Sequence, residues 1–292
     1  MIILMTARRS VRIVFGYAAA GLLFGSLACA SFDGGDDRAP GQGGGSAAVE
    51  TSTVASLTPE ASGRDWSCLD APQRSPSSNG PERVVFSMQV VDIGTGEPKA
   101  GLQARACGLT DIACDQPVVE SIASDRDGWF RVPVLAGFTG YLEMTGPGVM
   151  STLIFMSEPF AADSDPGVPA LAVSLATVDT LARVLGLTFD PMLGLVALRV
   201  FDCQGVPAPG VALSTSGTGI PYYFVGGLPT LDVRSTDPQG LGGFVNSAPG
   251  LAQVEVLAPS GDSIAGPRGL VIRPGWLSLI FVRPPRSLAR TR

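Results

Sequence analysis

The chain has 292 residues, 45% of them hydrophobic, which is enough for one large domain or two ordinary domains with a buried core. Glycine and proline are abundant, at 37 and 24 residues, and this composition is typical of chains with many turns and few long helices. The net charge is −6 and no basic stripe runs along the chain, which argues against nucleic-acid binding because phosphate contacts need clustered Lys and Arg. The sequence has no histidine, which excludes histidine-based triads, general bases and metal ligands.

Residues 1–29 are typical of an export signal. Arg8, Arg9 and Arg12 precede an apolar run over 13–28, which is shorter than the roughly 20 residues of a membrane-spanning helix. Ser26-Leu27-Ala28-Cys29 resembles a bacterial lipobox, although Ser26 stands where that motif usually has Leu. The resemblance implies lipidation of Cys29 and an outer-membrane lipoprotein. The alternative is ordinary signal-peptidase cleavage and a secreted or periplasmic protein.

An internal repeat with an offset of about 110 residues organises the rest of the chain. Residues 84–101 and 194–210 each contain an alternating apolar strand that ends in Asp, followed by Gly-x-Pro-x-x-Gly. A repeat of this length indicates two copies of one domain rather than a solenoid. The paired positions are Asp92, Gly96, Pro98 and Gly101 in the first copy, and Asp202, Gly205, Pro207 and Gly210 in the second.

Strands separated by Gly, Pro and Asp turns predict an all-β fold of two tandem Greek-key antiparallel β-sandwiches. Apolar residues at helical spacing over 177–185, ended by Gly186, predict one short helix between the copies. The expected organisation is a signal (1–29), a flexible linker (30–63), a cysteine-containing segment (64–82), sandwich one (83–165), a linker with the helix (166–192), sandwich two (193–284) and a tail (285–292).

These residues resemble the carboxypeptidase regulatory-like, or transthyretin-like, β-sandwich family. The resemblance rests on the strand–Asp–turn pattern and on Asp125-x-x-Gly128-x-Phe130, and the second copy around Gly240 matches more loosely. It implies an accessory, adhesive or structural module of a secreted protein, and it brings no catalytic set to carry over.

Four cysteines remain beyond Cys29, and an even number in an exported chain indicates disulfides. Three connectivities are open. We favour a local Cys107–Cys114 pair and a long-range Cys68–Cys203 pair, since a bridge over a long loop constrains the unfolded chain most. A four-thiolate zinc site is disfavoured because the cysteines lack the close Cys-x-x-Cys spacing.

Catalytic and cofactor motifs are weak. The sole lysine, Lys99, has no Ser-x-x-Lys partner and belongs to no phosphate-binding loop. Asp125 and Asp127 fit a hairpin turn better than a calcium loop, as a metal alternative would need six or more oxygens from this region and from Asp163 and Asp165. We therefore expect no catalytic residues, no metal and no cofactor.

Tyr222, Tyr223 and Phe224, between Pro221 and Gly226, are predicted to form an exposed loop patch that could bind a ligand. The expected function is a non-enzymatic lipoprotein with a structural or interaction role at the cell envelope, held at the membrane by its lipid and meeting an envelope protein or polysaccharide. A carbohydrate-binding or adhesion module is the alternative, and a carboxylate-pair hydrolase is the weakest hypothesis.

Overall fold

A computed structural model describes residues 64–69, 82–160 and 163–284. Cys29, the predicted signal, the linker over 30–63 and the tail over 285–292 lie outside these residues. Within the described part of the chain, no helix has the length and apolar character needed to cross a membrane.

The described residues form fifteen strands and one helix, so the expected all-β class is confirmed. The first copy contains β1 (Arg83–Asp92), β2 (Gln103–Cys107), β3 (Val119–Ala123), β4 (Trp129–Leu135), β5 (Tyr141–Thr145), β6 (Thr152–Met156) and β7 (Ala170–Ala172). Helix α1 (Leu175–Val184) follows. The second copy contains β8 (Gly194–Val200), β9 (Ala212–Thr215), β10 (Ile220–Val225), β11 (Leu228–Thr230), β12 (Leu241–Ser247), β13 (Gly250–Leu257), β14 (Arg268–Ile272) and β15 (Leu277–Val282).

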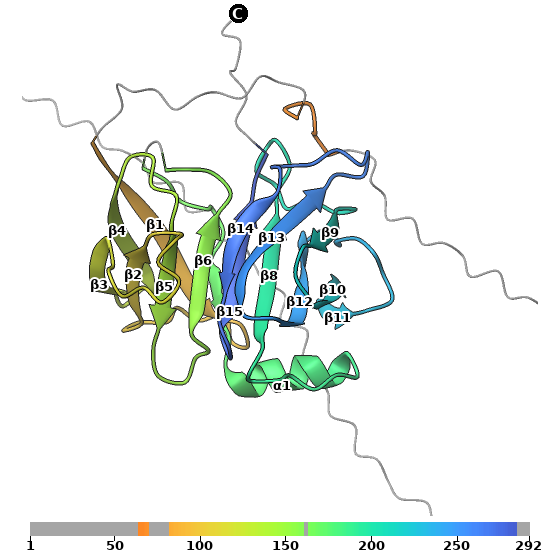
Figure 1. Cartoon of the computed structure of the whole chain (residues 1–292), viewed down its shortest axis with the longest axis horizontal. Helices are drawn as coiled ribbons and strands as arrows, with labels where there is room; N and C mark the ends of the chain where they lie inside the picture. Colours follow the sequence, from red (N-terminus) through yellow and green to blue (C-terminus); the bar gives the residue numbers. More distant parts are fainter. Residues whose placement is uncertain (1–63, 70–81, 161–162, 285–292) are drawn as a thin grey trace, which may run out of the picture. The chain divides into compact units, whose positions relative to one another are not determined.

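The two copies share one nine-stranded sheet, a feature that the sequence does not predict. Its order is β11-β10-β12-β8-β15-β6-β5-β2-β3, so strands of the second copy continue directly into strands of the first. Strand β15 joins them, because it pairs in parallel with β6 on one side and with β8 on the other. Figure 1 shows β15 between these two strands.

Two small sheets cover opposite faces of the shared sheet. Consecutive residues of a strand point to opposite faces, and in β15 Leu279 and Phe281 belong to one core while Ile280 and Val282 belong to the other. The first core also contains residues of β1, β4 and α1, and the second contains residues of β13 and β14. The sheet β4-β1-β7 therefore packs with α1 on one face, and β14-β13-β9 packs on the other.

The repeat is visible in backbone hydrogen bonds. The N–H of Val90 donates to the carbonyl of Gly128 at 2.9 Å, and the N–H of Val200 donates to the carbonyl of Gly240 at the same distance. A Cβ added at Gly128 would lie 2.5 Å from the Val90 carbonyl oxygen, and one at Gly240 would lie 2.4 Å from the Val200 carbonyl oxygen. The same close approach of two backbones therefore requires glycine in both copies.

A buried hydroxyl closes the same turn in each copy. Ser124 Oγ donates to the Lys99 carbonyl at 2.8 Å, and Thr236 Oγ1 donates to the Ala208 carbonyl at 2.7 Å. Each hydroxyl also accepts the N–H of the residue that follows the turn glycine, Leu102 in the first copy and Val211 in the second. The two copies thus share side-chain detail as well as strand order.

The copies differ in the pairing of their third strand, which is β3 in the first copy and β10 in the second. In the first copy β3 pairs with β2, whereas in the second copy β10 pairs with β12. The second copy thereby extends the shared sheet with the β10–β11 hairpin, and leaves β9 at an edge.

The predicted helix forms two residues earlier than expected. Ser174 caps α1 by accepting the N–H of Thr177 with its hydroxyl, a common way to satisfy an unpaired helical donor. Gly186, at φ +70°, follows its end as expected. Strand β7 lies in the range expected to be a linker, where it pairs in parallel with β1.

Candidate functional site

A buried ion cluster lies where the two copies meet. Glu143, on β5, is only 5% exposed. Its Oε1 accepts from Arg105 at 2.7 Å, and its Oε2 accepts from Arg273 at 2.6 Å. Arg105 belongs to the first copy and Arg273 follows β14 of the second, so one carboxylate holds a cation from each copy.

Arg273 also fixes the loop between β2 and β3. Its Nε donates to the Ile112 carbonyl at 2.8 Å, and its Nη2 donates to the Tyr141 hydroxyl at 2.8 Å. The Tyr141 hydroxyl donates in turn to the Asp111 carbonyl at 2.5 Å. Burial raises the pKa of Tyr141 above its ordinary value, so this hydroxyl keeps its proton and its donor role.

The guanidinium of Arg273 lies 4.7 Å from the ring centroid of Trp276 and 5.7 Å from that of Tyr141. Stacking of this kind adds to the ion pair in a partly dry environment. The cluster is therefore saturated by its own members, and its evident role is to join the copies.

Both expected disulfides are present. Cys107 bonds to Cys114 at the base of the loop that Arg273 contacts, and Cys68 bonds to Cys203 across 135 residues. The ligand atoms of Cys107, Cys114 and Glu143 lie within 4.8 Å of one another. The disulfide and the two arginines occupy these atoms, so the group does not bind a metal in this form.

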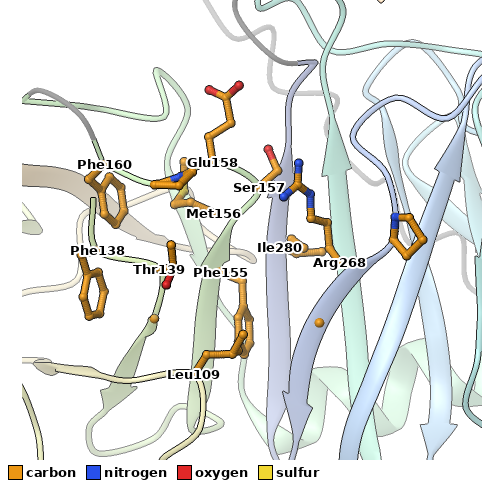
Figure 2. A pocket seen from close by; sticks show the side chains of 14 residues that line it. Leu109, Phe138, Thr139, Phe155, Met156, Ser157, Glu158, Phe160, Arg268 and Ile280 are labelled. Atoms are coloured by element: carbon orange, nitrogen blue, oxygen red, sulfur yellow. The ribbon is translucent and has the colours of Figure 1, made fainter. Parts of the chain in front are cut away.

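A pocket of about 170 Å³ lies beside this junction. Its floor contains Phe155 of β6 and Ile280 of β15, both from the shared sheet, and Leu109 comes from the disulfide loop. Figure 2 shows Phe138 and Phe160 on one side, with Phe155, Ile280 and Arg268 on the other. Both copies therefore contribute to the pocket.

The expected exposed patch at Tyr222, Tyr223 and Phe224 is wrong. These residues lie in β10, where Tyr222 is 7% and Tyr223 is 3% exposed, and Phe224 is half-buried. The tyrosines face opposite cores because they are adjacent in a strand.

Glycines opposite the tyrosines explain this burial. In the register of β10 with β12, Tyr222 faces Gly243 and Tyr223 faces Gly242. A Cβ at Gly243 would lie 2.8 Å from the Tyr222 hydroxyl, so only glycine leaves space for the ring. The Tyr222 hydroxyl donates to the Val196 carbonyl at 3.2 Å, and burial raises its pKa.

The candidate calcium carboxylates are turn residues. Asp125 accepts the N–H groups of Asp127 and Trp129, and it pairs with Arg131 at 2.9 Å. The pKa of Asp125 is lowered, mainly by the Trp129 N–H and then by Arg131. Asp163 and Asp165 each accept a backbone N–H as well, from Val85 and Gly167 respectively.

The residues that sequence analysis missed are Glu143, Arg105, Arg273 and Arg268. The available signal was a charged residue within or beside a short run of apolar strand residues: Glu143 in YLEMT, and Arg268 two residues before Leu270. The pairing of Glu143 with Arg273 depends on the shared sheet, which no local pattern indicates.

No known family profile and no curated protein matches this chain. Among solved structures, the Bacillus anthracis TIE protein is similar at 12% identity and a TM-score of 0.23, over 69% of this chain and 34% of that one. Hydroxyquinol 1,2-dioxygenase from Pseudomonas putida DLL-E4 is similar at 15% and 0.22, over 34% and 46%. A double mutant of the shaft pilin SpaA from Lactobacillus rhamnosus GG is similar at 12% and 0.22, over 71% and 99%.

The chain thus spans about a third and about half of the first two proteins. These likenesses to β-sandwich domains, pilins among them, are distant, and TM-scores this low carry no argument about function. The two disulfides are typical of proteins that fold in an oxidising compartment. The chain is therefore a disulfide-bonded β-sandwich protein of extracytoplasmic type.

Proposed function

We propose that this protein is an exported lipoprotein, anchored through Cys29, that serves as a non-enzymatic structural or interaction module of the cell envelope. The observation that carries the proposal is the interlocking of the copies: β15 completes a sheet common to both. The shared sheet and the buried ion cluster join the copies directly rather than through a hinge, which suits a part that holds partners at a fixed spacing.

The anchoring is tested by intact mass of the protein from membrane and medium fractions. We expect a membrane-bound species that begins at Cys29 and carries acyl chains, and Cys29→Ser should move the protein out of the membrane fraction. A mature species that begins beyond Cys29 and is found only in the medium would contradict the anchor.

The non-enzymatic role is supported by the state of the polar clusters described above. Glu143, Asp125 and the tyrosines are engaged in pairing within the fold. We expect the purified protein to show no turnover of glycans or esters, and turnover that survives repurification would contradict this role. The buried positions of Tyr222 and Tyr223 remove the observation that favoured a sugar-binding platform.

We further propose that both copies are modules of the carboxypeptidase regulatory-like type. The shared geometry of the turns at Gly128 and Gly240 supports this assignment, together with the equivalent pairing of β1 with β4 and of β8 with β12. Aligning homologous sequences tests this assignment. We expect both turn glycines and the Gly-x-Pro-x-x-Gly spacing to be kept in both copies.

A further inference from the structure

Arg268 occupies a position where the fold calls for an apolar side chain. In β14, Leu270 and Ile272 are buried in the second core. Alternate residues of a strand point to the same face, so Arg268 also faces the shared sheet. Its side chain lines the pocket above Ile280, as Figure 2 shows.

The guanidinium of Arg268 has an unsatisfied donor, because its Nε is buried and has no hydrogen-bond partner within the described part of the chain. Burial lowers the pKa of Arg268, while the nearby Glu158 carboxylate acts in the opposite direction. A buried donor left unpaired is costly, and a carboxylate is the group that a guanidinium fork binds best.

The rest of the pocket combines apolar side chains that can hold a ring with the polar side chains of Thr139, Ser157 and Glu158. Phe138, Phe155, Phe160, Leu109 and Ile280 supply apolar surface. The volume of about 170 Å³ is close to that of an engineered apolar cavity of about 150 Å³ that binds benzene. One benzene-sized group therefore fits, and a larger ligand would extend out of the pocket.

We propose that this pocket binds a carboxylate that carries a benzene-sized apolar group, with the apolar group among the three phenylalanines and the carboxylate on Arg268. This chemistry has two sources, a free aromatic acid or the C-terminal residue of a peptide. The inference concerns a site on the described fold and does not depend on how the chain is anchored.

Strand β14 is an edge strand, and its unpaired edge offers hydrogen bonds that distinguish a peptide C-terminus from a free aromatic acid. The Val271 carbonyl accepts from Ser278 of β15, so it points away from β13. Residues two apart in a strand direct their backbone N–H and C=O groups to the same side. Those of Gly269 therefore also point away from β13, on the side where Gly269 lines the pocket. A peptide can hydrogen-bond to this edge as an added strand, whereas a free acid cannot.

The test is titration calorimetry of the purified full chain with four probes: 3-phenylpropanoate, N-acetyl-Ala-Phe with a free carboxylate, 3-phenylpropanamide and propanoate. We expect saturable binding of the first two, with a Kd of roughly 0.1 mM for ligands this small. The uncharged amide and the ringless acid should bind at least about tenfold more weakly. Tighter binding of the peptide than of 3-phenylpropanoate would assign the site to peptide ends, and the reverse would assign it to free acids.

Arg268→Leu separates binding from folding. Leucine continues the apolar row of Leu270 and Ile272, so the variant should unfold at a temperature equal to or above that of the parent chain. Its affinity for 3-phenylpropanoate should fall at least about tenfold. Arg126→Leu, which removes an arginine whose side chain is 92% exposed, is the matched control and should bind as the parent does.

Equal binding of the acid and its amide, or unchanged affinity in Arg268→Leu, would overturn the proposal. A dimer that forms without ligand and is lost in Arg268→Leu would also overturn it, since the pocket would then belong to a second copy of the chain.

Discussion

At the scale of single residues, the two copies are defined by a few turn positions. Gly128 has φ +76° and lies against the Val90 carbonyl, while Gly96 has φ +72° and faces open space. Any other residue would be strained at either position because of the positive φ. At Gly128 its Cβ would also overlap with the Val90 carbonyl oxygen, whereas at Gly96 it would meet no other atom.

Gly128→Ala should therefore destabilise the protein more than Gly96→Ala. We expect a loss of about 1 kcal/mol for Gly96→Ala and of about 3 kcal/mol or more for Gly128→Ala. Urea unfolding of the two variants checks this, and equal losses would mean that β1 shifts to accommodate the new methyl group.

The turn aspartates predict a dependence of stability on pH. The pKa of Asp92 is lowered, first by Lys99 and then by the N–H groups of Gly94 and Thr95, and the pKa of Asp125 is lowered as described above. A carboxyl whose folded pKa lies below its unfolded value, about 3.9, stabilises the fold above that value and loses this contribution as pH falls through the folded pKa.

The free energy of unfolding should thus be level near neutral pH and fall below about pH 4. Asp125→Asn, which removes one of these carboxyls, should have a shallower decline than the parent chain between about pH 4 and about pH 2. An identical slope in the variant would show that Asp125 does not contribute to the acid transition.

Sequence patterns succeeded where the structure depends on local chemistry. The turn glycines and the short helix follow from residue type and spacing. The disulfide pairing that the sequence analysis favours, one of three open connectivities, is the one present. The prediction for Tyr222 and Tyr223 is wrong because their burial depends on Gly242 and Gly243, which lie about twenty residues away on the neighbouring strand. The pocket was missed for the same kind of reason, since its walls come from both copies.

At the scale of elements, the segment over 64–69 is held by one covalent bond. Cys68 bonds to Cys203 beside the turn at Asp202, where Arg64 also reaches Asp202 at 4.0 Å. Trp66 and Leu69 pack against the second core, so the segment covers apolar surface as well. The disulfide therefore ties an early part of the chain to the second copy.

Removing this disulfide should cost more than removing the local one. In the chain-entropy model, a bridge over 135 residues contributes about 5 kcal/mol and one over seven residues about 2.5 kcal/mol. We expect Cys68→Ser/Cys203→Ser to have a lower unfolding midpoint than Cys107→Ser/Cys114→Ser, each measured without reductant.

The reverse order would have a structural meaning. It would show that the loop held by Cys107–Cys114, with its contacts to Arg273 and Tyr141, contributes more than chain entropy predicts.

At the scale of the whole described fold, the shared sheet couples the two copies. Phe281 of β15 is buried in the first core, although β15 is the last strand of the second copy. Damage to β15 should therefore loosen both copies together instead of one.

Phe281→Ala should lower the free energy of unfolding by about 3–5 kcal/mol. Hydrogen exchange should rise together in peptides from β1–β4 and from β13–β14, because both sheets pack on strands that β15 joins. Leu251→Ala, at a position that is 63% exposed, is the control and should change neither. Faster exchange in only one copy would show that the copies unfold independently.

The central place of β15 also bears on the order in which the fold is made. Every other described strand precedes β15 in the chain, yet β15 lies between β6 and β8. As the polypeptide emerges from the ribosome, the earlier strands have two unpaired sheet edges facing one another until residues 277–282 appear. Completion of the sheet therefore waits for residues 277–282, and until they are in place the earlier strands lack the closed form that would resist threading through a narrow channel.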